Sequence, residues 1–186
     1  LEFRRVLFRS NIYVIRHGQT ELNVKGLING QLEDALTAEG MEQARTAAKS
    51  LPKTIKHLYV SPLNRARQTA EILNAELNLP ITFHDELKEV NFGELQGTPY
   101  LDEYKKRHGA LDYDWGPSGE NVEQVKVRVL RILRDIKNSS GDGEALIVAH
   151  GGIVYLLNFL ESGETLGPVG NASLHSFDID KILAQT

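Results

Sequence analysis

NIYVIRHGQTELN, at residues 11–23, runs from an apolar stretch directly into an arginine, a histidine and a glycine. The β-branched and apolar residues 12–16 predict a strand that is buried on both faces. A buried strand has no use for a cation and an imidazole at its end unless an anionic group is held there. The stretch therefore predicts a central strand with an anion site at its carboxyl end.

The rest of the sequence alternates short apolar runs with helical patterns. HLYVS (57–61) and ALIVAH (145–150) predict two more buried strands, and residues 173–180 predict a late strand at an edge. Apolar residues spaced by three and four predict helices over 41–51, 63–77, 122–136 and 153–160. Strands separated by helices indicate an α/β fold, a three-layer α/β/α sandwich with a mostly parallel central sheet.

Two local features refine this organisation. Ser61 and Pro62 are expected to start a helix, with the serine hydroxyl as its cap and proline at the first helical position. The least regular stretch, about 93–120, is rich in tyrosine and carries a tryptophan beside KKRH (105–108). We expect it to form a short lid insertion over one end of the sheet, with KKRH as a solvated helix face.

The start of the chain needs separate treatment. Residues 1–10, LEFRRVLFRS, match the translation of a common sequencing-library adapter. We expect them to be a non-native tail that is not part of the fold. Residues 11–186 are then a single domain.

Composition limits the possible functions. The 186 residues carry a formal net charge of -4 and include no cysteine. This excludes disulfides, thiolate metal sites and a cysteine nucleophile. No apolar run is long enough for a transmembrane helix, and no basic stripe of the kind that binds nucleic acid is present. We expect a cytoplasmic protein without a membrane or nucleic-acid partner, and its oligomeric state stays open.

Three motifs fall at the predicted strand ends. They are Arg16-His17-Gly18, Ser61-Pro62 with Arg65 one turn onward, and His150-Gly151-Gly152. In open α/β sheets, ligands bind beyond the carboxyl ends of the strands. Guanidinium groups match phosphate oxygens in a bidentate way, and glycines let the backbone approach a ligand closely. The combination predicts a phosphate site.

The chemistry at such a site follows from these residue types. A neutral imidazole nitrogen can attack phosphorus without first losing a proton, so a histidine is a candidate nucleophile. The leaving alkoxide then needs an acid, for which Glu89 in HDELKEVNFGELQG (84–97) is the candidate. Two arginines and two histidines can supply the positive charge that a metal ion supplies at many phosphate sites. The sequence contains no P-loop and no histidine-rich spacing typical of a metal site. We therefore expect no metal and no cofactor.

Four segments, in this order, resemble the motifs of the histidine phosphatase superfamily, also called the phosphoglycerate mutase-like family. They are RHGQTELN (16–23), SPLNRARQTAEIL (61–73), LKEVNFGELQG (87–97) and IVAHGG (147–152). The resemblance extends from Asn11 to about Ser176. Two positions depart from the usual pattern, because Leu22 stands at a frequent tryptophan and Ala35 at a frequent proline.

The resemblance implies a role for individual residues. His17 would become phosphorylated, and Glu89 would be the proton donor. The phosphate-binding residues would be Arg16, Asn23, Arg65, His150 and Gly151, and the substrate pocket would include Gln19, Thr20 and Gly30. The remaining histidines, which lack a convergent partner in the sequence pattern, are expected on the surface or in loops. They are His57, His84, His108 and His175.

The predicted function is that of a metal-independent phosphomonoester phosphatase, acting on small phosphorylated metabolites through phospho-His17. A 2,3-bisphosphoglycerate-dependent phosphoglycerate mutase is the nearest alternative, since it would use the same residues. Only 61 positions separate Glu89 from His150, and the lid lacks an obvious arginine pair, which favours hydrolysis. A non-catalytic module that binds phosphorylated ligands is the second alternative.

Overall fold

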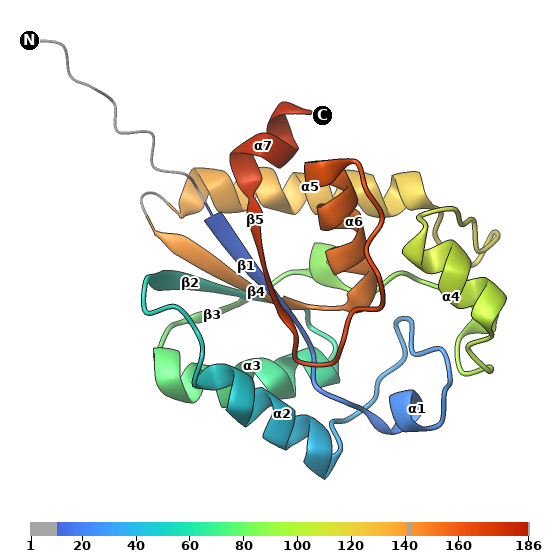
Figure 1. The fold of residues 1–186 in the computed structure, drawn as a ribbon, viewed down its shortest axis with the longest axis horizontal. Coiled ribbons are helices and arrows are strands. Elements are labelled where there is room, and N and C mark those ends of the chain that lie inside the picture. The colour runs from blue at the N-terminus through green and yellow to red at the C-terminus, as the bar shows by residue number, and fades with distance from the viewer. Residues whose placement is uncertain (1–10, 141–142, 186) are drawn as a thin grey trace, which may run out of the picture.

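The computed structural model describes residues 11–140 and 143–185, so the predicted tail at residues 1–10 lies outside the described residues. Five strands form one sheet in the order β3-β2-β4-β1-β5 (Figure 1). They are β1 (Asn11–Arg16), β2 (Ile55–Val60), β3 (Ile81–Phe83), β4 (Glu144–Ala149) and β5 (Leu174–Asp178). Four strands run parallel, and β5 pairs antiparallel with β1 at the edge. The mostly parallel sheet and its late edge strand are confirmed.

Helices cover both faces of the sheet (Figure 1). The helices are α1 (Glu21–Val24), α2 (Ala38–Ala48), α3 (Asn64–Leu77), α4 (Asp102–Gly109), α5 (Val122–Ser139), α6 (Gly151–Ser162) and α7 (Ile179–Ala184). Two short 3-10 turns are η1 (Asp85–Leu87) and η2 (Gly93–Leu95). Helices α2 and α3 lie on one side of the sheet and α5, α6 and α7 on the other, which confirms the three-layer α/β/α prediction.

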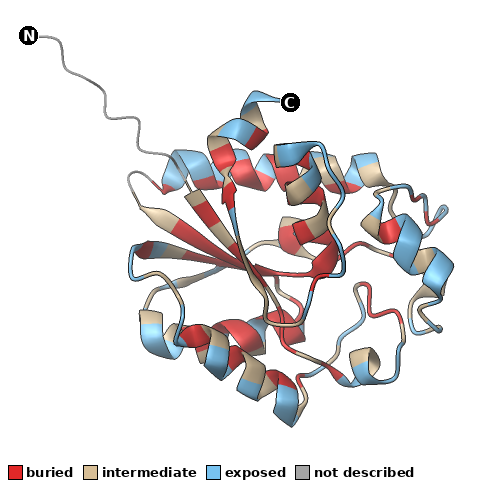
Figure 2. Ribbon diagram, in the orientation of Figure 1, coloured by how far each residue is buried: buried red, intermediate tan, exposed pale blue. Residues whose placement is uncertain are grey.

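The alternation of side chains along the central strand β4 explains the layers. Ala145, Ile147 and Ala149 pack in one apolar cluster with residues of α5 and α6. Leu146 and Val148, which point the other way, pack in a second cluster with α2 and α3. Because both faces of β4 are covered, its sequence is continuously apolar, as expected for a central parallel strand. Figure 2 shows the buried residues along the strands and on the sheet-facing sides of the helices.

The start of α3 differs from the prediction. Its first helical residue is Asn64 and its N-cap is Leu63, without a side-chain capping bond. Ser61 is therefore not the cap, and Pro62 lies before the helix. The Ser61 hydroxyl instead lies 2.7 Å from Nε2 of His150. The Ser-Pro pair marks the exit from β2, and a long-range partner decides what the serine hydroxyl does.

The segment expected to form a lid contains η2 and α4, and α4 lies beside the sandwich rather than over a sheet face (Figure 1). A function as a lid stays a prediction. No helix among the described residues has the length and apolar character to cross a bilayer.

Because both faces of β4 are buried, shortening one of its side chains should cause a large loss of stability. Ile147→Ala, at a fully buried side chain, should lower the free energy of unfolding by about 2–5 kcal/mol in a urea titration. Val127→Ala on α5, where the valine is 50% exposed, is the control and should change it by less than about 0.5 kcal/mol. Equal effects of the two substitutions would contradict the core assignment.

Candidate active site

A cavity of about 720 Å³ opens at the carboxyl ends of the central strands. The predicted site residues in its lining are Arg16, His17, Asn23, Gly30, Arg65 and Glu89, whereas His150 and Gly151 are not part of the lining. These six predicted residues of the lining come from β1 and its end, from α1 and the loop after it, from α3 and from the segment after η1. The fold thus brings together side chains that are up to 73 positions apart, from Arg16 to Glu89.

His17 follows β1 and is held by its backbone, since its N–H donates to the Ala149 carbonyl at 3.0 Å. The ring lies between two fixed partners. Nδ1 lies 2.7 Å from the Gly18 carbonyl, and Nε2 lies 3.2 Å from the donor Nε of Arg65. A carbonyl only accepts and a guanidinium only donates, so Nδ1 carries the proton and Nε2 carries the lone pair. The nucleophilic nitrogen therefore points at a cation.

The electrostatic surroundings keep this ring neutral. Burial, followed by the positive charges of Arg65 and Arg16, lowers the pKa of His17 well below its ordinary value of 6.5. A neutral imidazole retains the lone pair that an attack on phosphorus requires. The ring can therefore act as a nucleophile at neutral pH without a separate base.

Arg65, in the first turn of α3, is fully buried. Its Nη1 donates to the Leu32 carbonyl at 2.8 Å and its Nη2 to the Gly30 carbonyl at 2.7 Å. Burial lowers the pKa of Arg65 to about 10, so the guanidinium stays charged at neutral pH. Each terminal nitrogen keeps a second N–H that these bonds leave available for an anion.

Arg16 approaches the same cavity from the end of β1. Its Nη1 donates to the Val169 carbonyl, and its buried Nε has no hydrogen-bond partner among the described residues. Burial lowers the pKa of Arg16, while the charge of Glu89 partly offsets that effect. A buried guanidinium N–H without a partner is costly, so it is available for a bound anion.

His150, at the end of β4, is fully buried, and its ring centre lies 5.2 Å from that of His17. Its Nε2 is 2.7 Å from the Ser61 hydroxyl, while its Nδ1 has no partner among the described residues. Burial and the charge of Arg65 lower the pKa of His150 well below 6.5. If Ser61 donates to Nε2, Nδ1 carries the proton of the neutral ring and can donate it to a phosphoryl oxygen.

Glu89 is only 8% exposed, and its carboxylate is held by backbone donors. The Val90 N–H donates to Oε1 at 2.9 Å, and the Gly152 N–H donates to Oε1 and Oε2 at 3.1 and 3.2 Å. Gly152 lies in the first turn of α6, where backbone N–H groups have no partner within the helix, so its N–H can hold the carboxyl group. Glu89 is thus held at the wall of the cavity that both arginines also line.

The glycines of the motifs serve packing more than ligand approach. A Cβ on Gly18 would lie 2.3 Å from the Gly40 carbonyl oxygen of α2. A Cβ on Gly152 would lie 2.4 Å from Glu89 Oε1, whereas one on Gly151 would meet its nearest neighbour, Arg16 Nε, only at 3.8 Å. Gly18 therefore brings α2 close to β1, and Gly152 makes room for the carboxylate.

Asn23 lines the cavity within a chain of side-chain amides. Its Oδ1 accepts from Asn171 Nδ2 at 3.2 Å, and its Nδ2 donates to Asn29 Oδ1 at 3.2 Å. Gln19 and Thr20, predicted in the pocket, are not in the lining. Gln19 Oε1 accepts from Thr37, and the fully buried Thr20 caps α1. A contact of either residue with the substrate stays a prediction.

His108 also differs from the expectation of a surface histidine. It is 4% exposed, lines the cavity, and its Nδ1 lies 2.6 Å from the Tyr100 hydroxyl. Its ring packs edge-on against Phe92 and Tyr155. Only the lysines and the arginine of KKRH face solvent. The sequence did offer one indication of this cluster. The irregular stretch expected to form the lid is rich in aromatic residues, which could have predicted a buried environment for His108.

Metal-ligating side chains do not gather elsewhere in the described part of the chain: no group of three histidines, aspartates or glutamates there could hold an ion. The expectation that the chemistry needs no metal stays a prediction.

The family model of the histidine phosphatase superfamily (branch 1) matches residues 12–181. The chain belongs to this superfamily. Glucosyl-3-phosphoglycerate phosphatase of Mycolicibacterium vanbaalenii is 32% identical over 182 residues, which cover 87% of this chain and 81% of that protein. The resemblance drawn from the four motifs is therefore confirmed.

Solved structures of the superfamily agree with this fold. A mycobacterial glucosyl-3-phosphoglycerate phosphatase in complex with VO3 has a TM-score of 0.80 and 28% identity, covering 90% of this chain and 92% of the other. A phosphoglycerate mutase from Thermus thermophilus has a TM-score of 0.74 and 30% identity, and the match covers 90% of this chain and 92% of the other. Phosphatase and mutase names both occur among these superfamily members, so the likeness alone leaves the reaction open.

The low pKa of His17 has a measurable consequence. In an NMR titration, the His17 and His150 rings should stay neutral as the pH falls through 6.5, where an exposed histidine takes up a proton. The unfolded chain binds these protons first, so the protein should also lose stability as the pH falls below about 6.5. Protonation of either ring near pH 6.5 would contradict the neutral site.

Gly152→Ala tests the contact between α6 and Glu89. The added methyl group displaces the carboxylate, so turnover of an alkyl phosphate should fall about tenfold or more. Gly170→Ala is the matched control, because a Cβ there meets no atom within 4 Å. Both variants should fold, as measured by circular dichroism. Normal turnover by Gly152→Ala would show that the position of Glu89 does not matter.

Proposed function

We propose that the protein is a metal-independent phosphomonoester phosphatase that acts through a phosphohistidine at His17. The single observation that carries this proposal is the orientation of that ring, with its lone pair on Nε2 inside a cavity that also holds the buried Arg65 and the half-buried Arg16. Phosphatase names among superfamily members support it.

In the first step, the Nε2 lone pair attacks phosphorus and the bond from phosphorus to the ester oxygen breaks. Arg16, Arg65 and Nδ1 of His150 stabilise charge on the equatorial oxygens. Glu89 gives its proton to the departing oxygen, which leaves as the alcohol. The Gly18 carbonyl, 2.7 Å from Nδ1, stabilises the positive charge that develops on the His17 ring.

In the second step, water enters the position that the alcohol has left. Glu89, now a carboxylate, takes a proton from the water as its oxygen bonds to phosphorus. The bond from phosphorus to nitrogen breaks and its electron pair returns to Nε2. Glu89 is protonated again and phosphate leaves, so the site returns to its starting state.

The cavity supports small molecules as the substrates. Its volume of about 720 Å³ lies in the ordinary range of small-molecule sites. The wall away from His17 combines aromatic side chains with basic ones, including Phe92, Tyr100, Tyr155, Lys105 and Lys106. This wall suits the organic part of a phosphorylated metabolite.

The direct test measures phosphate release, in excess EDTA, from para-nitrophenyl phosphate and a panel of metabolite phosphates that includes 3-phosphoglycerate. Release should survive EDTA and disappear in His17→Ala. Release by His17→Ala at the wild-type rate would overturn the proposal. If phosphoglycerates interconvert after addition of bisphosphoglycerate, while no phosphate appears, the protein is a mutase instead. A folded protein with neither activity would be a binding module.

Arg65→Lys tests the geometry of the buried cation. Lysine keeps the charge, but all its donors are on one nitrogen, which cannot reach the carbonyls that two separate nitrogens of Arg65 hold and also bind a phosphoryl group. We expect kcat to fall about a hundredfold, measured with para-nitrophenyl phosphate. Arg67→Lys on the same helix, where Arg67 stacks over Phe83, is the control and should retain activity. Full activity of Arg65→Lys would remove Arg65 from the site.

A further inference from the structure

Glu89 lies in a segment that has no regular secondary structure. Residues 88–92 connect η1 to η2 without helix or strand, although Glu89, Val90 and Phe92 are buried. Backbone groups in such a buried connection need partners from elsewhere. The position of the acid is therefore decided by whichever side chains hold this backbone.

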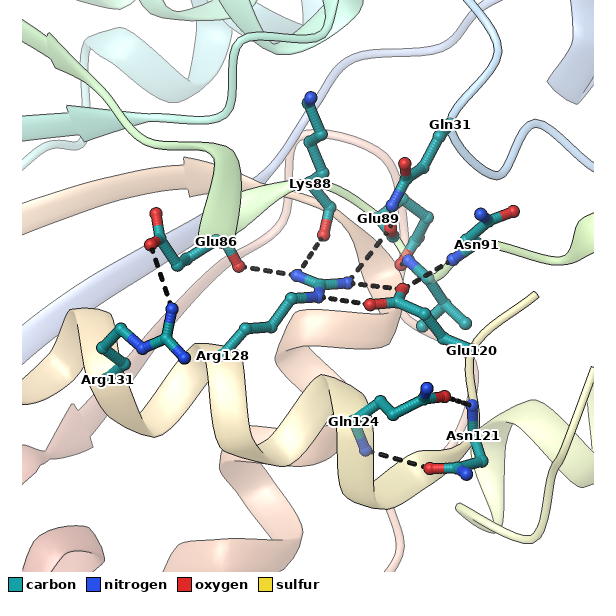
Figure 3. Close-up of polar contacts among 11 residues, drawn as sticks. Gln31, Glu86, Lys88, Glu89, Asn91, Glu120, Asn121, Gln124, Arg128 and Arg131 are labelled. Carbon is teal, nitrogen blue, oxygen red and sulfur yellow. Dashed lines mark hydrogen bonds and ion pairs between the residues drawn. The ribbon is translucent and has the colours of Figure 1, made fainter. Parts of the chain in front are cut away.

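Two of those partners come from one guanidinium (Figure 3), and Nε2 of Gln31 also donates to the Glu89 carbonyl, at 3.0 Å. Arg128 of α5 donates from Nη1 to the carbonyls of Glu86 and Lys88 at 2.6 and 2.8 Å. From Nη2 it donates to the carbonyl of Glu89 itself at 3.2 Å. Three carbonyls in and before this connection thus converge on a single side chain.

Glu120 completes the arrangement from the other side. Its carboxylate accepts from Arg128 Nε at 2.8 Å and from Nη2 at 3.0 Å, and it also accepts the Asn91 N–H at 2.9 Å. Its own N–H donates to the Asn91 carbonyl at 2.8 Å. Arg128 therefore has five N–H donors and five acceptors, and the pair holds the backbone on both sides of Glu89.

The pair is itself fixed relative to the core. Both side chains are largely buried, with 15% and 17% exposed. Glu120 directly precedes Asn121, which caps α5 through a reciprocal capping box with Gln124 (Figure 3). Helix α5 packs its apolar stripe against the sheet. The chain of contacts thus runs from the core through α5 to the backbone of Glu89.

We infer that Arg128 and Glu120 are positioning residues for the proton donor. This inference rests on the proposed function, in which Glu89 protonates the leaving oxygen. The carboxylate meets the Gly152 N–H of α6 on one side, and its backbone is set by α5 on the other. Loss of the pair frees the connection, so the carboxylate moves away from the leaving oxygen while His17 and the arginines stay in place.

The experiment compares two substrates that differ in their need for an acid. Para-nitrophenolate leaves with little protonation, whereas the alkoxide of glycerol phosphate needs a proton. Arg128→Lys offers three donors for five acceptors and should lower kcat/KM for glycerol phosphate about ten- to hundredfold more than for para-nitrophenyl phosphate. Glu120→Gln keeps the shape of the side chain and should change the ratio in the same direction.

Arg131→Lys is the matched control. Arg131 lies one turn further along α5, is 65% exposed and is 4.0 Å from the Glu86 carboxylate (Figure 3). Its ion pair is with Glu86 of η1, which lies before residues 88–92, so its substitution should leave the substrate ratio at the wild-type value. Thermal unfolding of each variant shows whether a loss of activity comes from a loss of folding. If Arg128→Lys does not fold, the substrate ratio of Glu120→Gln is the test of the inference.

The deciding measurement repeats Arg128→Lys in a Glu89→Gln background. A residue that acts through the acid has no further effect on the ratio once the acid is gone, whereas a general structural defect persists. The inference is overturned if Arg128→Lys lowers kcat/KM equally for both substrates. It is also overturned if Arg128→Lys changes the ratio of the two kcat/KM values in the Glu89→Gln background. Failure of the proposed function has another signature, because wild-type protein would then release no phosphate that depends on His17.

Discussion

The buried guanidinium of Arg65 imposes the constraint on which the rest of the site depends. Burial of a charge is costly unless hydrogen bonds surround it, and here the carbonyls of Gly30 and Leu32 provide them. The remaining direction of the guanidinium faces Nε2 of His17. That contact and the Gly18 carbonyl at Nδ1 together fix the tautomer of His17, and burial and the positive charge keep the ring neutral. Anion binding and nucleophilicity thus have the same physical cause.

The site joins parts of the fold that regular secondary structure does not connect. β1 and β4 bring His17 and His150 to one sheet edge because parallel strands end together. Glu89 comes from an irregular connection, so its position depends on the backbone donor of Gly152 and on the Arg128–Glu120 pair. The two histidines are therefore positioned by the sheet, whereas Arg65 is positioned by α3 and Glu89 by contacts from α5 and α6.

Sequence patterns predicted the sheet and the convergence of the cations because both depend on local periodicity and on where strands end. β3 was missed, since three residues with mostly exposed side chains carry no clear pattern. His108 was misassigned because its basic neighbours indicated a solvated face, while its burial depends on aromatic rings distant in the chain. The bond between Ser61 and His150 likewise joins positions 89 apart, and no local rule predicts it.

The central claim is that Nε2 of His17 accepts the phosphoryl group. Glu89→Gln, with para-nitrophenyl phosphate, tests this most directly, because the leaving group needs little acid while hydrolysis loses its base. The enzyme should accumulate a phosphoryl group that alkali does not remove, and phosphorus NMR with peptide mass spectrometry should locate it on Nε2 of His17. Release of nitrophenol without phosphohistidine, or a phosphoryl group on another residue, would contradict the account.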